Sequence, residues 1–252
     1  MFNLKGKVAI ITGGNGGIGL GMARGLAKAG AKIVIAARNK EKSRAAVLDL
    51  QTLSAEAFAI EVDVRNEQSV ANMTSEAIGQ YGRIDILVNN AGMSIRKPVQ
   101  DLLLDEWQQV LDTNLTSAFL CARAVYPHMK QGGAGKIINI GSMLSIFGSP
   151  YAPAYSASKG GIVQLTKSMA TAWAADAIQV NAILPGWIDT ELTQQARQAV
   201  CGLDERVIAR TPAGKWGCAD DLAGVAVFLA SSASDFITGA AIPVDGGYSA
   251  LA

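Results

Sequence analysis

The chain has 252 residues and a formal net charge of +1, and half of its residues are hydrophobic. This length suits one large domain with a single core, and the composition excludes disordered and fibrous proteins. Because the basic residues form no dense cluster, we expect neither a nucleic-acid partner nor a membrane partner.

The three cysteines, Cys121, Cys201 and Cys218, lie far apart and show no paired spacing. They indicate reduced thiols in a cytoplasmic protein, not a disulfide framework or a zinc site. With a single histidine, His128, and no cluster of ligating side chains, no catalytic metal is expected.

Short apolar runs alternate with amphipathic stretches along the whole chain. The runs lack polar alternation, which is typical of strands buried on both faces of a parallel sheet. The expected strands are 8–11, 32–36, 57–62, 84–88, 136–140, 178–184 and 240–244. This order predicts an α/β fold with a Rossmann-like, doubly wound, parallel seven-stranded sheet and helices on both faces, in a single domain over residues 1–252.

One connection, about 187–216, is longer than the others and contains short helix-like pieces. Long connections at the carboxyl edge of such sheets often cover a substrate, so a lid-like segment is predicted here. A plain surface excursion is the alternative.

A glycine-rich segment, Thr12–Gly19, follows the first expected strand and precedes a helix. A backbone without Cβ atoms can turn sharply there, and it lets a pyrophosphate approach the free N–H groups of the helix N-terminus. The placement predicts a dinucleotide site, although a purely structural glycine turn remains the alternative.

The end of the second expected strand bears on the choice of cofactor. NAD-binding folds usually carry an acidic residue there, whereas this chain has Arg38, whose planar cation suits a 2′-phosphate. NADP(H) is therefore favoured, with NAD(H) as the alternative if Arg38 only stacks on adenine. Asp63, after the third strand, is either an adenine ligand or a helix cap.

Tyr155 and Lys159 are four residues apart at the start of an apolar-striped helix, which puts both side chains on one face. A neighbouring ammonium is expected to lower the pKa of the phenol, so that it can exchange a proton near neutral pH. Ser142, just past the fifth strand, is placed to hydrogen-bond a substrate oxygen.

Taken together, these motifs resemble the short-chain dehydrogenase/reductase family over nearly the whole length. The matching residues are Thr12-Gly13-x-x-x-Gly17-x-Gly19, Asn89-Asn90-Ala91-Gly92, Asn114, Ser142, Tyr155-x-x-x-Lys159, Pro185-Gly186 and Val244-Asp245-Gly246-Gly247. The resemblance implies an NAD(P)-dependent oxidoreductase that interconverts a secondary alcohol and a ketone. It also implies a homotetramer.

The resemblance also implies roles for single residues. The implied catalytic residues are Asn114, Ser142, Tyr155 and Lys159, with Tyr155 as the acid or base and Asn114 holding a proton-relay water. The implied cofactor-binding residues are Gly13, Asn15, Gly17, Ile18, Gly19, Arg38, Asp63, Val64, Asn90, Ala91, Gly92, Tyr155, Lys159, Pro185, Gly186, Ile188 and Thr190. Candidate substrate contacts are Ser94, Arg96, Ser142 and Trp187.

Within the family, Ser142–Ser145 and Pro212–Gly217 are similar to gluconate and 2-deoxy-D-gluconate dehydrogenases, and also to 3-oxoacyl reductases. A sugar acid, sugar or polyol is the expected substrate, and Arg96 is a candidate partner for its carboxylate or else a solvated loop charge. The alternatives are a 3-oxoacyl-thioester reductase and, more remotely, a protein that senses a dinucleotide without turnover.

Overall fold

The structure is a computed structural model that describes residues 1–251, with backbone only at Gln195 and Ala199; Ala252, at the end of the predicted domain, lies outside the described residues. Its centre is a parallel sheet in the order β3-β2-β1-β4-β5-β6-β7. The strands are β1 (Val8–Thr12), β2 (Lys32–Ala37), β3 (Ala57–Glu61), β4 (Ile86–Asn89), β5 (Gly135–Ile140), β6 (Ile178–Pro185) and β7 (Ala241–Val244). The predicted seven-stranded Rossmann-like fold is confirmed.

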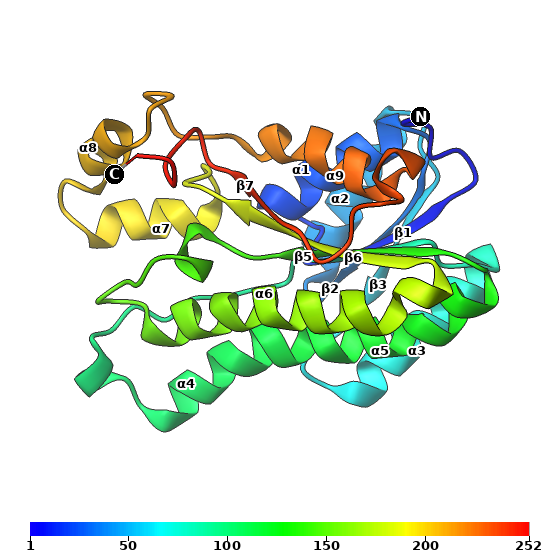
Figure 1. Cartoon of the computed structure of the whole chain (residues 1–252), viewed down its shortest axis with the longest axis horizontal. Helices are drawn as coiled ribbons and strands as arrows, with labels where there is room; N and C mark the ends of the chain where they lie inside the picture. Colours follow the sequence, from blue (N-terminus) through cyan, green and yellow to red (C-terminus); the bar gives the residue numbers. More distant parts are fainter. Residues whose placement is uncertain (252) are drawn as a thin grey trace.

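Helices cover both faces of the sheet (Figure 1). One layer holds α3 (Glu67–Tyr81), α5 (Ser117–Gln131) and α6 (Pro153–Trp173), with α4 (Leu104–Leu111) leading into α5. The other layer holds α1 (Gly17–Lys28), α2 (Lys40–Thr52) and α9 (Ala223–Ala230). Each layer closes its own core: Ile10 of β1 packs in the first, and Ala9 and Ile11 pack in the second, because strand side chains alternate between faces.

β4 begins two residues later than predicted. Asp85, just before it, is buried, and its carboxylate accepts hydrogen bonds from the Val8 N–H at 3.0 Å and from Lys7. Arg83 adds a bidentate ion pair to the same carboxylate. Asp85, which the sequence placed within an apolar run, therefore holds the start of β1 in position.

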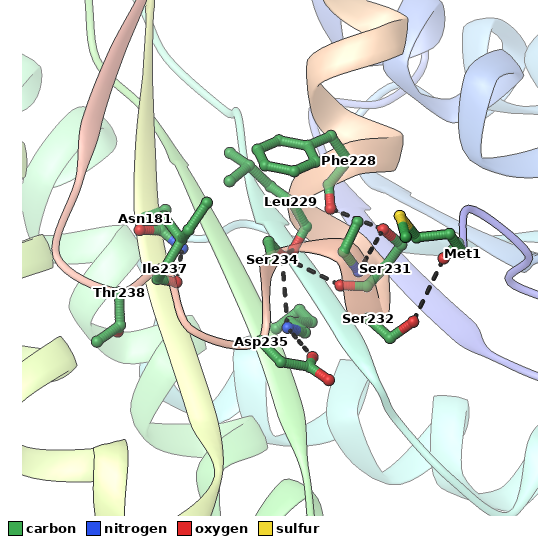
Figure 2. Close-up of polar contacts among 12 residues, drawn as sticks. Met1, Asn181, Phe228, Leu229, Ser231, Ser232, Ser234, Asp235, Ile237 and Thr238 are labelled. Atoms are coloured by element: carbon green, nitrogen blue, oxygen red, sulfur yellow. Dashed lines mark hydrogen bonds and ion pairs between the residues drawn. The ribbon is translucent and has the colours of Figure 1, made fainter.

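The segment between α9 and β7 is fastened by polar contacts, which Figure 2 shows. The buried Lys136 of β5 donates from Nζ to Asp235 at 2.7 Å, and Ser234 Oγ donates to the Leu229 carbonyl at 3.0 Å. Asn181 of β6 donates from Nδ2 to the Ile237 carbonyl at 2.8 Å. These bonds set β7 beside β6 and so place the C-terminal turn.

The predicted lid-like segment contains two helices, α7 (Glu191–Ala199) and α8 (Leu203–Arg210), at the opposite end of the molecule from the N-terminus (Figure 1). It has a small core of its own, made by Ala196, Leu203 and Val207 with Trp187, Val200 and Trp216. No helix among residues 1–251 is long and apolar enough to cross a membrane.

Candidate active site

A cleft of about 1050 Å³ opens at the carboxyl ends of the strands. Its walls are the segments that directly follow β1 to β6, together with the start of α7. The strand order reverses between β1 and β4, and ligands of doubly wound sheets bind outside that reversal. The cleft therefore lies where a dinucleotide is expected.

The glycine turn between β1 and α1 forms the floor of this cleft. Gly13 and Gly17 have φ angles of +62° and +51°, a region that other residues rarely adopt. Asn90 Nδ2 donates to the carbonyls of Thr12 and Gly13, at 2.9 and 3.0 Å. The Asn90 side chain thus braces the turn.

The same turn leaves the N-terminus of α1 open to an anion. Gly16 is the cap residue and offers no side-chain acceptor, so the N–H groups of the first turn remain available. A Cβ at Gly19 would lie 2.5 Å from both Asn90 Nδ2 and the Gly13 carbonyl, so only glycine fits there. A pyrophosphate fits this cradle.

Most of the predicted cofactor residues come together in the cleft. Its lining includes Gly13, Asn15, Gly17, Ile18, Arg38, Asp63, Val64, Asn90, Ala91, Gly92, Tyr155, Lys159, Pro185, Gly186, Ile188 and Thr190. Gly19 does not line the cleft; it packs closely against the Asn90 amide and the Gly13 carbonyl. Asn15 donates its amide to Ser43 Oγ at 3.1 Å, which ties the turn to α2.

Arg38 and Asp63 line the adenosine end of the cleft and have different surroundings. Arg38 is exposed and forms no ion pair with the described residues. Asp63 pairs with Arg65 through two side-chain bonds of 3.0 and 2.7 Å, and the Arg65 guanidinium lowers the pKa of Asp63 to about 2. Arg65 was not predicted as a site residue, although its spacing from Asp63 could have indicated the pair.

Tyr155 and Lys159 lie on one face of α6, beside β5. Lys159 is buried, its Nζ donates to the Ile140 carbonyl at 2.6 Å, and it lies 5.5 Å from the centroid of the Tyr155 ring. Burial disfavours the ammonium and lowers the pKa of Lys159 to about 8.

The pKa of Tyr155 is raised above its usual value by burial and is also influenced by two neighbouring residues. Burial raises this pKa, while a hydrogen bond to Ser142 and the positive charge of Arg96 act to lower it. That Lys159 lowers the pKa of the phenol stays a prediction.

Asn114 lies in a π-helical turn, Asp112–Thr116, between α4 and α5. Its Oδ1 accepts from the Met93 N–H at 2.8 Å, and its Nδ2 donates to the Met93 carbonyl and to Ser158 Oγ. A Cβ at Gly92 would lie 3.4 Å from Asn114 Oδ1 and 3.8 Å from Lys159 Nζ, so these groups border the same point. The extra residue of a π-turn often marks a functional site.

The predicted substrate residues do not all line the cleft. Ser142 lines the cleft, whereas Ser94, Arg96 and Trp187 do not. Arg96 is exposed but close enough to Tyr155 to influence its pKa. Trp187 packs edge-on against Trp216, with ring centroids 5.4 Å apart, in the core of the α7–α8 segment. Its prediction as a substrate contact is not supported by this position.

The sequence did not indicate a contact between the Arg210 guanidinium and two aromatic rings. Arg210, at the end of α8, lies 4.4 Å from the Tyr248 ring centroid and 5.2 Å from that of Phe147. Phe147 follows Ser142 closely, so this contact joins α8 to the loop that carries Ser142.

No group of metal-ligating side chains occurs in the part of the chain that the structure describes.

Comparison with known proteins agrees with this geometry. The family model described as enoyl-(acyl carrier protein) reductase matches residues 13–249. The 2-dehydro-3-deoxy-D-gluconate 5-dehydrogenase of Formosa agariphila is 41% identical over 98% of this chain and 94% of its own length. The gluconate 5-dehydrogenase of Gluconobacter oxydans is 38% identical over 98% of this chain and 96% of its own.

Among solved structures, a gluconate 5-dehydrogenase from Burkholderia cenocepacia in complex with NADP and tartrate superposes with a TM-score of 0.95. It is 42% identical, and the match covers 100% of this chain and 98% of that one. The fold, the glycine cradle and the Ser–Tyr–Lys group define an NAD(P)-dependent oxidoreductase that acts on CH–OH groups. The chain belongs to the short-chain dehydrogenase/reductase family.

Proposed function

We propose that this enzyme interconverts a secondary alcohol and a ketone on a sugar acid of the gluconate type, with NADP(H) as the preferred cofactor. The observation that carries the substrate class is Arg96. Arg96 is an exposed residue, although partial burial lowers the pKa of its guanidinium, and it forms no ion pair with the described residues; its charge influences the pKa of Tyr155. A substrate carboxylate that pairs with Arg96 would hold the sugar chain across the phenol.

A bound nicotinamide cofactor supplies or accepts the hydride. In reduction, the Tyr155 hydroxyl donates a proton to the ketone oxygen, and in oxidation its phenolate accepts that proton. Ser142 donates to the same oxygen and fixes its orientation. Lys159 binds the nicotinamide ribose, and Asn114, beside it, holds the water that links Lys159 to solvent.

The preference for NADP(H) is supported by Arg38, which lines the cleft and forms no ion pair with the described residues. Its planar cation matches a phosphate better than a ribose hydroxyl. The NADP bound in the Burkholderia cenocepacia relative is consistent with this preference.

Three further features belong to the proposal. The α7–α8 segment closes over the substrate as a lid, since its first residues line the cleft. The enzyme is a homotetramer, as the apolar side chains exposed on α4 and α5 favour. It works in the cytoplasm, in keeping with its three free cysteines.

A substrate panel tests the proposal. With either nicotinamide, turnover should be highest on gluconate or 2-dehydro-3-deoxygluconate, lower on an uncharged polyol of equal length, and negligible on a β-ketoacyl thioester. Arg96→Gln should raise the KM for the sugar acid about tenfold and leave the KM for the polyol unchanged. Arg44→Gln, another exposed arginine, is the matched control.

The reaction mechanism has its own test. Tyr155→Phe should lower kcat by about 10²- to 10⁴-fold while cofactor binding persists.

Two outcomes would contradict these expectations. In the substrate panel, preferential turnover of the thioester would replace the sugar-acid proposal with the 3-oxoacyl reductase. Full turnover by Tyr155→Phe would exclude the proposed proton transfer.

A further inference from the structure

One ion pair joins two walls of the cleft. Lys42 Nζ donates to both carboxylate oxygens of Glu191, at 2.8 and 2.6 Å. The two residues are 149 positions apart, and both line the cleft. Lys42 belongs to α2, on the adenosine side, and Glu191 is the first residue of α7, where the lid-like segment begins.

The local structure fixes where Lys42 lies. Asn39 caps α2, and its side chain accepts from the Lys42 N–H at 2.9 Å, so Lys42 lies in the first turn of the helix. Arg38 immediately precedes this cap. The two cations thus border the end of the cleft at which the proposed site holds the adenosine phosphate.

Three other cations near this end pair with carboxylates that lie outside the lid-like segment. Lys40 pairs with Glu61 of β3, and Lys40 and Glu61 line a separate groove between α2 and β3. Arg65 pairs with Asp63, and Arg24 with Asp49. Among the described residues, Lys42 is the one cation of this end whose carboxylate comes from the lid-like segment.

The Lys42–Glu191 pair is easily broken. The two side chains are 50% and 77% exposed, and ion pairs in water gain little because solvent screens them. A phosphate monoester carries nearly two negative charges and three acceptor oxygens, so it competes well with one carboxylate for an ammonium. Lys42 can therefore change partners at small cost.

We propose that Lys42 determines cofactor specificity by exchanging between Glu191 and the 2′-phosphate of NADP(H). This inference rests on the proposed cofactor site. With the phosphorylated cofactor, Lys42 joins Arg38 on the phosphate and releases the start of α7. With the unphosphorylated cofactor, Lys42 stays on Glu191 and the pair remains closed across the cleft.

The exchange gives each partner an opposite effect. Lys42 strengthens NADP(H) binding and contributes little to NAD(H) binding. Glu191 weakens NADP(H) binding, because it competes for Lys42 and places a negative charge near the phosphate. A pair that merely stabilised the fold would instead change the binding of both cofactors equally.

Calorimetric titration with NADPH and NADH tests the exchange. Lys42→Met should raise the Kd for NADPH about tenfold and change that for NADH by less than about twofold. Glu191→Gln should lower the Kd for NADPH by about two- to fivefold, and this gain should vanish in the double variant. Lys40→Met and Glu61→Gln, the neighbouring pair outside the cleft, are matched controls and should bind like the wild type.

The outcomes separate this inference from the proposed function. If the wild type binds both dinucleotides but Lys42→Met behaves like Lys40→Met, the exchange is excluded and the proposed function stands. Equal weakening of NADPH and NADH by Lys42→Met also excludes it. A wild type that binds neither dinucleotide would overturn both proposals.

Discussion

At the scale of single residues, the site buries the ammonium of Lys159, where loss of water disfavours its charge. Lys159 is 4% exposed, and burial lowers its pKa from 10.5 to about 8. Among residues 1–251 the structure shows no carboxylate paired with this charge; the hydrogen bond of its Nζ goes to the Ile140 carbonyl. Perturbed groups of this kind gather at functional sites, where stability is given up for chemistry.

The cost of this burial should be visible in the pH dependence of stability. The native Lys159 loses its proton near pH 8, whereas the unfolded chain keeps it up to about pH 10.5. Between these values the unfolded state binds more protons, so the free energy of unfolding rises with pH. Compared with Lys159→Met, the wild type should gain about 3 kcal/mol from pH 8 to 10.5.

Urea denaturation at matched protein concentration measures this difference. Lys167→Met, on the exposed side of the same helix, is the control, and its difference from the wild type should stay flat with pH. A flat difference for Lys159→Met as well would mean that the buried ammonium is better solvated than its surroundings indicate.

At the scale of elements, Gly19, the last glycine of the turn, is required by close packing and not by its backbone conformation. Gly19→Ala would bring a Cβ to 2.5 Å from Asn90 Nδ2 and from the Gly13 carbonyl. The Asn90 brace would have to shift, so the free energy of unfolding should fall by about 1 to 3 kcal/mol and dinucleotide binding should weaken. Gly16→Ala meets nothing within 4 Å and should leave stability nearly unchanged in the same denaturation experiment. Equal stability of the two variants would contradict the packing argument.

The elements that sequence predicted best are those whose pattern is local. Apolar runs located all seven strands because helices cover both faces of the sheet, which buries the inner strands almost fully and the edge strands β3 and β7 in part. The π-turn at Asp112–Thr116 had no such pattern, since its extra residue is held by tertiary bonds from Asn114 to Met93 and Ser158. The start of β4 was misplaced for a similar reason, because Asp85 is satisfied by partners from other segments.

At the scale of the whole molecule, motif residues could be predicted but their electrostatic partners could not. Tyr155, Lys159 and Ser142 were recognised from spacing, yet the influence of Arg96 on Tyr155 depends on how the loop after β4 meets α6. The Lys42–Glu191 pair joins segments 149 residues apart. Trp187 follows a family motif directly, but its packing against Trp216 forms only when the α7–α8 segment folds back.

Apolar side chains exposed on the α4–α5 layer bear on assembly. Leu103, Leu104 and Phe119 are 63%, 77% and 43% exposed, and groups of this kind mark interaction surfaces. In a two-fold interface each side chain meets the same patch of its partner, so one substitution acts on both sides. Phe119→Lys would set like charges against each other at such a contact.

Sedimentation velocity should therefore give a tetramer for the wild type and a smaller assembly for Phe119→Lys. Leu48→Lys is the control: Leu48 is 56% exposed on α2, in the opposite helix layer, and its substitution should leave the tetramer intact. Tetramers for both variants would move the interface away from α5. A monomeric wild type would remove the proposed assembly, and the exposed apolar group on α4 and α5 would then have to serve another contact.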